Sequence, residues 1–98
     1  MMPRVLVLGA SGRLGQRLRR HWPVLFPQAQ FLWQMRRPDP EAGCILFDPL
    51  GQPPDCGPVD VVVGLAGVVP GAGDLNLNAD LALAAVTLGR RFGARHVL

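Results

Sequence analysis

Three glycines spaced three residues apart stand where an apolar run ends and a helical pattern begins. Residues 5–8 (VLVL) suit a strand buried on both faces, and Gly9, Gly12 and Gly15 follow within the stretch GASGRLG. Glycines in such a turn leave room for a phosphate-bearing ligand and for a helix that packs close to the strand. The free N–H groups at the N-terminus of that helix lie at the positive end of the helix dipole and can bind an anion. We therefore expect an anion site formed by the backbone N–H groups of Ser11 to Leu14.

The spacing of the glycines separates this turn from two other nucleotide-binding turns. A P-loop needs Gly-Lys-Ser or Gly-Lys-Thr after its glycines, and this chain contains no lysine. The pattern G-x-x-G-x-x-G also differs from the G-x-G-x-x-G of the general dinucleotide fingerprint. Taken alone, the glycines are also compatible with a tight strand-to-helix turn that binds nothing.

In dinucleotide-binding folds an acidic residue about 20 positions past the glycines usually forms hydrogen bonds with the adenosine ribose. Two arginines occupy this place in the chain. Counting from Gly15 leads to Met35, and Arg36 and Arg37 follow it. Arginine pairs well with the 2′-phosphate of NADP, whereas the ribose diol of NAD prefers a carboxylate. We expect Arg13, inside the glycine turn, to join these two arginines. NADP is thus favoured as the cofactor, NAD is possible, and plain surface charge is the alternative for all three arginines.

Length and charge bound the class of protein. The 98 residues make one domain, and an apolar fraction of 49% is enough for a small core. The net charge is +3, and all 10 cationic residues are arginine, a bias typical of a GC-rich coding sequence. Stacking aromatic residues are not interleaved with the arginines, so a nucleic-acid partner is not expected.

The chain shows no feature of a membrane or secreted protein. No apolar stretch approaches the length of a membrane span, and the first strand begins at Arg4, which leaves no room for a signal peptide. Cys44 and Cys56 are isolated from each other and from histidines, so we expect reduced thiols and no metal or redox pair. These features predict a cytoplasmic protein with no membrane partner.

Five strands would position the candidate residues. We expect them at residues 4–8, 30–35, 44–47 and 59–65, with a fifth beginning at residue 96. A first helix is expected from about 13 to 22, with an inward stripe of Leu14, Leu18 and Trp22. Pro23 should end this helix.

A second helix is expected from about residue 75 to residue 92. Asp74 is a plausible N-cap and Gly93 a plausible stop. Its inward stripe comprises Leu77, Leu81, Leu88 and Phe92.

The alternation of strands and helices predicts an α/β fold with a doubly wound parallel sheet, which is Rossmann-like. Only about eight residues separate the second strand from the third, too few for a crossover helix. Residues 48–58 carry four of the 10 prolines and must cross the sheet as a loop. We therefore expect loops in place of two of the helices.

The stretch GASGRLG resembles the glycine turn of the short-chain dehydrogenase/reductase superfamily, particularly its extended branch of NAD(P)-dependent epimerases and dehydratases and the neighbouring atypical branch. This resemblance implies the strand order 3-2-1-4-5. It also implies that Asp48, directly after the third strand, hydrogen-bonds the adenine edge. The alternative for Asp48 is a turn-forming role before Pro49.

Weaker similarities continue toward the C-terminus. Leu65, Ala66 and Gly67 resemble the turn after the family's fourth strand, where the backbone passes close to the cofactor. Asn78 matches an Asn early in the following helix, although an Asn on a helix surface is the alternative. GARHVL at residues 93–98 resembles the entry to the fifth strand. The resemblance thus implies cofactor contacts along the whole chain.

The family's catalytic residues are missing from this chain. Members catalyse with a Ser or Thr after the fifth strand and a Tyr-x-x-x-Lys on the next helix, whose lysine lowers the pKa of the tyrosine. Here there is no tyrosine, no lysine and a single serine, Ser11. We expect the chain alone to be inactive and, because it ends within an apolar strand, to be a truncated gene product or a piece of a longer protein.

Two classes of function stay open. The first is the NAD(P)-binding portion of an epimerase/dehydratase-type or reductase-type oxidoreductase, whose catalytic half and small-molecule substrate contacts lie beyond residue 98. The second is a non-catalytic module that senses NADPH, as in some atypical members. Dihydrodipicolinate reductase also has a G-x-x-G-R-x-G turn and is a less favoured match. Ala66, Gly67 and the helix that contains Asn78 resemble that family less. The substrate and the oligomeric state do not follow from the sequence.

Overall fold

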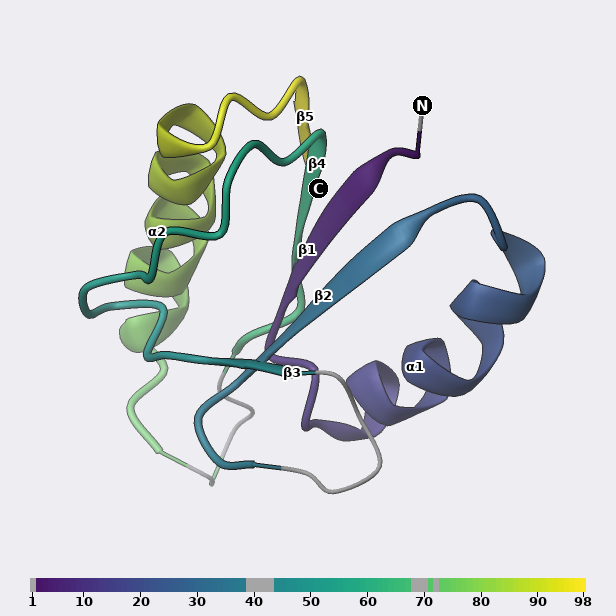
Figure 1. Ribbon diagram of the computed structural model, residues 1–98. Helices are drawn as coiled ribbons and strands as arrows, with labels where there is room; N and C mark the ends of the chain where they lie inside the picture. Colours follow the sequence, from purple (N-terminus) through teal and green to yellow (C-terminus); the bar gives the residue numbers. More distant parts are fainter. Residues whose placement is uncertain (1, 39–43, 68–70, 72) are drawn as a thin grey trace.

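The chain forms one five-stranded parallel sheet between two helices (Figure 1). The computed structural model describes residues 2–38, 44–67, 71 and 73–98. Its elements, in chain order, are β1 (Arg4–Leu8), α1 (Arg13–Leu25), β2 (Gln30–Met35), β3 (Cys44–Leu46), β4 (Val61–Gly64), α2 (Leu77–Arg91) and β5 (His96–Val97). The strands lie in the order β3-β2-β1-β4-β5. The predicted α/β class, parallel sheet and strand order are confirmed.

Strand β1 lies at the centre of the sheet. Val7 pairs with Trp33 of β2 on one side and with Val63 of β4 on the other. Leu6 and Val7 have no exposed surface. A strand covered on both faces must be apolar at successive positions, which is why the VLVL run is continuous and not alternating.

The two faces of the sheet carry separate apolar clusters, each covered by one helix. Leu18 and Trp22 of α1 pack on a cluster of Val7, Ala10, Trp33, Met35 and Val63. On the opposite face α2 contributes Ala85, Leu88 and Phe92 to a cluster with Leu6, Leu8, Val59 and Val62. Figure 1 shows α1 and α2 on opposite sides of the strands. The result is a three-layer arrangement that fixes the carboxyl edge of the sheet relative to both helices.

The connection from β3 to β4 is a loop, as predicted. Residues 47–60 form neither helix nor strand and pass on the α2 side of the sheet (Figure 1). The connection from β2 to β3 includes residues 39–43, which lie outside the described part of the chain. β3 and β4 are shorter than expected, although pairing continues past their ends through bonds such as Leu65 N–H to the Leu8 carbonyl, at 2.9 Å.

Helix α1 begins at Arg13 as predicted but differs from the prediction in its last residue and in the exposure of Leu14. It continues through Pro23 to Leu25, and the Phe26 N–H donates to the Trp22 carbonyl at 2.7 Å. A proline so close to the C-terminus of a helix removes only one hydrogen bond, so the last turn persists. The inward position predicted for Leu14 is wrong, because its side chain is 57% exposed.

Helix α2 begins two residues later than expected. Asn76 occupies the N-cap position, whereas the Asp74 carboxylate accepts a hydrogen bond from the Asn76 N–H at 2.9 Å. Asp74 therefore shapes the turn before the helix and does not cap it. Leu77, predicted to be buried, is 37% exposed, and the stop at Gly93 is confirmed by its φ of +73°. In the described residues, neither helix is long and apolar enough to cross a membrane.

Candidate functional site

The glycine turn lies directly against the loop that follows β4. Gly9 has a φ of +78°, a conformation that residues with a side chain rarely adopt. A Cβ atom at Gly9 would lie 2.5 Å from the backbone nitrogen of Ala66. Both constraints require glycine, and they bring the turn after β1 into contact with the turn after β4.

Helix α1 presents backbone donors beside open space. Gln16 donates its N–H to the Gly12 carbonyl at 2.9 Å, so the N–H groups of Arg13 and Leu14 come before the helical ladder begins. In this described first turn there is neither a side-chain cap nor an acidic residue. A Cβ atom at Gly12 would meet only the Gly9 carbonyl, at 3.7 Å. Exposed helix N–H groups of this kind bind anions.

Gly15 lets α1 approach the end of β1. It is buried, and a Cβ atom there would run into the backbone carbonyl of Ala10. Ala10 itself has no exposed surface and belongs to the cluster beneath α1. The third glycine of the motif thus allows the close packing of helix on strand that the sequence predicts for it.

A hollow of about 440 Å³ opens at the carboxyl edge of the sheet. It lies among the glycine turn, the ends of β2 and β4, the loop after β3 and the start of α2. Eight of the predicted site residues line it, namely Gly9, Ser11, Gly12, Arg36, Asp48, Leu65, Ala66 and Gly67. Its volume falls within the range of about 300–1,000 Å³ that is typical of small-molecule sites.

Five predicted site residues do not line this hollow. Arg13 and Leu14 are exposed on the first turn of α1, Gly15 is buried beneath it, and Arg37 is exposed one residue past Arg36. Asn78 lies at the border of the hollow, because its Oδ1 is 3.3 Å from the position of a Cβ atom on Gly67. The lining therefore includes both the glycine turn and Arg36 but does not include Arg37.

Asp48 forms a turn and also faces the hollow. Its Oδ1 accepts a hydrogen bond from the Leu50 N–H at 2.9 Å, and its backbone carbonyl accepts one from the Gly51 N–H at 2.9 Å. This is the Asx-type turn expected of an Asp before a proline. The carboxylate has a second oxygen, and the exposed side chain lines the hollow. The two roles considered for Asp48 are therefore compatible.

Several residues of the lining were not singled out from the sequence. Gln34 is the clearest of them, because a glutamine inside the apolar strand QFLWQM is a signal that the sequence already carries. The others are apolar and carry no chemical signal of their own, namely Met35, Pro49, Leu50, Leu77 and Leu81.

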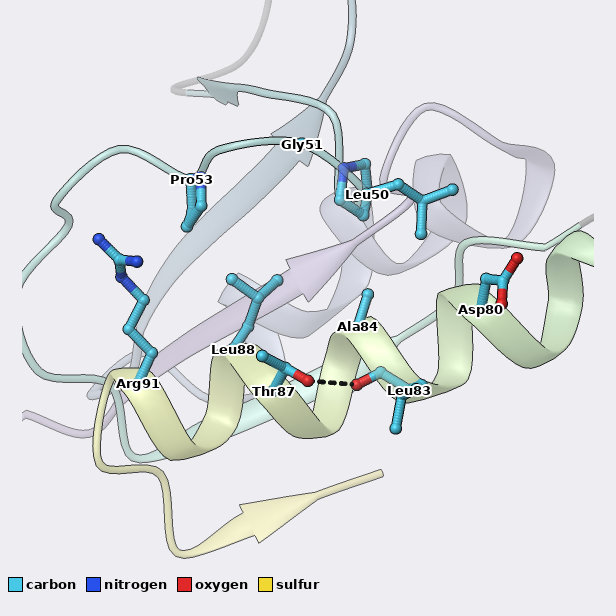
Figure 2. A pocket seen from close by; sticks show the side chains of 10 residues that line it. Leu50, Gly51, Pro53, Asp80, Leu83, Ala84, Thr87, Leu88 and Arg91 are labelled. Carbon is cyan, nitrogen blue, oxygen red and sulfur yellow. Dashed lines mark hydrogen bonds between the residues drawn. The ribbon is translucent and has the colours of Figure 1, made fainter.

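A second hollow, of about 400 Å³, lies between α2 and the loop after β3 (Figure 2). Ala84 and Leu88 point from the helix toward the loop, and Asp80 and Arg91 lie toward opposite ends of the helix. The hydroxyl of Thr87 donates to the Leu83 carbonyl of its own helix at 3.0 Å. Because its polar groups do not converge on one point, this hollow is a weaker candidate for a ligand than the one at the carboxyl edge.

Both cysteines are free thiols. Burial raises the pKa of the Cys56 thiol above its ordinary value of 9.0, and the nearby charge of Arg4 opposes the shift. Among the described residues, no group of three His, Cys, Asp or Glu side chains could hold a metal ion. The side chains at the carboxyl edge thus supply positive charge, one carboxylate and backbone donors.

Comparison with known proteins adds no relative to these observations. No family model matches the sequence, and no curated protein matches it either. The geometry of the carboxyl edge and the motif within it are therefore what indicate a function.

Proposed function

We propose that this domain binds a dinucleotide across the carboxyl edge of its sheet and prefers NADP to NAD. The observation that carries the proposal is the single hollow of about 440 Å³ at the glycine turn. It is lined by residues from four separate segments that the sequence analysis predicts to bind the cofactor, around Gly9, Arg36, Asp48 and Ala66. Ligands of open α/β sheets bind outside the carboxyl ends of the strands, where this hollow lies.

The glycine turn fits a pyrophosphate. The exposed N–H groups of Arg13 and Leu14 would donate to its oxygens, and Gly12 would leave room for it, because a Cβ atom there would point into open space. No charged side chain is needed for this contact, since the helix terminus supplies partial positive charge.

Arg36 supports the preference for NADP. It is exposed and lines the hollow, at the end of the strand that in dinucleotide-binding folds reads the adenosine ribose. Its guanidinium would pair with the 2′-phosphate, with Arg37 and Arg13 adding positive charge nearby. Asp48 would then contact the adenosine part of the ligand. Other parts of the cofactor would contact Leu65, Gly67 and Asn78.

We further propose that the domain is the cofactor-binding portion of an epimerase/dehydratase-type or reductase-type oxidoreductase that works in the cytoplasm. The resemblance of GASGRLG to the short-chain dehydrogenase/reductase turn supports this role, and the free thiols of Cys44 and Cys56 suit a reducing compartment. The bound cofactor would supply hydride transfer. Residues outside this chain would then contact the small-molecule substrate.

A module that senses NADPH without turnover is the second candidate. The specific observation in its favour is that the 98 residues contain neither tyrosine nor lysine. A general acid or base of the Tyr-x-x-x-Lys kind cannot come from this chain. Both candidates share the same binding site.

Mapping of amide resonances in solution tests the shared site. Addition of NADPH to the isotope-labelled chain should shift the amide signals of Ser11, Gly12, Arg36 and Ala66. The amide of Thr87, which lines the second hollow, serves as the internal reference. Shifts confined to Thr87 and its neighbours, or no shifts at all, would contradict the proposal.

A further inference from the structure

Gln34 is the one buried polar or charged residue among those that the structure describes. It is 2% exposed, and it lies on β2 between the buried side chains of Trp33 and Met35. Burying an amide costs free energy unless each end finds a hydrogen-bond partner. An apolar residue of similar size would fill the same space without this requirement, so its hydrogen bonds need an explanation.

The amide of Gln34 joins two loops that both line the hollow. Its Oε1 accepts a hydrogen bond from the Gly9 N–H at 2.8 Å, at the first residue of the glycine turn. Its Nε2 donates to the carbonyl of Phe47, the residue directly before Asp48. One side chain on β2 therefore connects the turn after β1 with the turn after β3.

The backbone of the same residue adds a separate contact. The Gln34 carbonyl accepts a hydrogen bond from the Ala10 N–H at 3.0 Å. The turn at residues 48–51 likewise has its own support, from the bonds of Asp48 to Leu50 and Gly51. The Phe47 N–H also donates to the Met35 carbonyl of β2, at 3.2 Å, so backbone bonds attach both loops to this strand. What the side-chain amide adds is a direct link between the two loops.

We propose that Gln34 is a positioning residue that sets the glycine turn and the Asp48 turn at the separation a whole dinucleotide requires. The inference rests on the proposed function, in which the glycine turn holds the pyrophosphate and the Asp48 turn the adenosine. Two subsites held in a fixed relation bind a linked ligand better than subsites that move independently. Gln34 should therefore matter more for the intact dinucleotide than for either of its halves.

The residue type suits this role because glutamine accepts with one end of its amide and donates with the other. A glutamate carboxylate could accept from Gly9 but could not donate to the Phe47 carbonyl. Methionine has similar length and can form neither bond. Asparagine keeps the amide but is one methylene shorter, so it cannot reach both partners.

Calorimetric titration of the folded chain tests the proposal. Gln34→Met removes both side-chain bonds and should weaken NADPH binding about tenfold, because the two turns would no longer be held at a fixed separation. The same variant should bind adenosine 2′-monophosphate, which has no 5′-phosphate and so occupies only the adenosine end, within about twofold of the unmodified chain. The matched control is Gln30→Met on the same strand, because Gln30 is exposed and its Oε1 contacts Arg4 at the opposite edge of the sheet. This control should leave both affinities unchanged.

Amide hydrogen exchange gives a readout that needs no ligand. In Gln34→Met the Gly9 amide should lose protection, while the Ala10 amide, which is bonded to the backbone of the same residue, should keep it. A purely structural role would instead reduce the protection of both amides together. Gln34→Asn, measured in the same way, covers the case in which Gln34→Met does not fold.

The outcomes separate the two claims. If the unmodified chain fails to bind NADPH, the proposed function is wrong, and the inference that rests on it is wrong with it. If the unmodified chain binds and Gln34→Met or Gln34→Asn binds NADPH equally well, only the role of Gln34 is overturned. An equal loss for NADPH and adenosine 2′-monophosphate would also overturn it, because the effect would then not depend on linking the two turns.

Discussion

The backbone of Gly9 lies against the backbone of Ala66, so closely that a Cβ atom on Gly9 would come within 2.5 Å of the Ala66 nitrogen and 2.6 Å of its Cα. Neither backbone atom can move aside in the way that the end of a flexible side chain can. The contact joins the turn after β1 to the turn after β4. It therefore fixes the relative position of two turns that line the hollow.

Gly9→Ala should destabilise the domain more than the same substitution at Gly93. Both glycines have positive φ, +78° and +73°, but Gly93 has open space where its Cβ atom would be. The left-handed conformation costs each variant about 1–2 kcal/mol. The clash with Ala66 should cost Gly9→Ala about 1–3 kcal/mol more. Urea unfolding followed by tryptophan fluorescence measures the difference, and equal losses would show that the close contact does not exist in solution.

Gly12→Val should abolish NADPH binding while the domain stays folded. The new side chain would occupy the space in which the pyrophosphate is proposed to lie, whereas its nearest protein neighbour is the Gly9 carbonyl, 3.7 Å from the Cβ position. We expect a loss of stability below about 1 kcal/mol, as for an exposed helix terminus. Circular dichroism checks the fold and calorimetry the affinity. An unchanged NADPH affinity would mean that the binding site is wrongly placed.

Arg36→Ala should remove most of the preference for NADPH over NADH, and Arg37→Ala less. Arg36 lines the hollow, and Arg37 does not. A charge-assisted hydrogen bond contributes about 1.5–3 kcal/mol, which is tenfold or more in relative affinity. The affinity for NADH should stay nearly unchanged, because NADH has no 2′-phosphate.

Arg90→Ala is the matched control for Arg36→Ala, since it removes one positive charge from the exposed last turn of α2. The control should keep the preference. The preference of the unmodified domain should also weaken as salt rises, because the exposed guanidinium is screened. A control variant that loses the preference as fully as the Arg36 variant would reduce the effect to net charge.

The stability of the domain should fall as the pH rises above about 9, in part because of Cys56. Burial raises the pKa of this thiol above 9.0, so the folded state disfavours the thiolate. The stabilisation is present below the pKa of the unfolded chain and is lost as the pH rises through the folded pKa. The chain has no tyrosine or lysine, so few other side chains titrate in this range. Urea unfolding between pH 8 and about 11 should show a smaller fall for Cys56→Ala than for Cys44→Ala.

The strands could be predicted from the sequence because each is an apolar run whose neighbours supply clear turn signals. β1 and β2 begin and end at the expected residues, 4–8 and 30–35. Helix ends were less predictable. Pro23 did not stop α1, because a proline in a last turn removes a single bond, and Asp74 bonded within its own turn instead of capping α2.

The candidate site was predictable where a residue's type alone decides its role. Gly9 lies as its motif predicts, because its positive φ and its contact with Ala66 allow only glycine there. Gly12 lines the hollow as predicted. Arg37 and Leu14 are exposed and do not line the hollow. No pattern in the sequence distinguishes adjacent exposed side chains at the edge of a sheet. The role of Gln34 depends on two loops meeting above one strand, a tertiary relationship that a strand pattern does not encode.

Titration of the unmodified domain with NADPH and NADH at low salt is the most direct test of the central claim. We expect saturable binding of one NADPH per chain, with an affinity about tenfold or more above that for NADH. Absence of saturable binding by either dinucleotide would contradict the proposed function. Equal affinities for NADPH and NADH would contradict the role given to Arg36 and return it to plain surface charge.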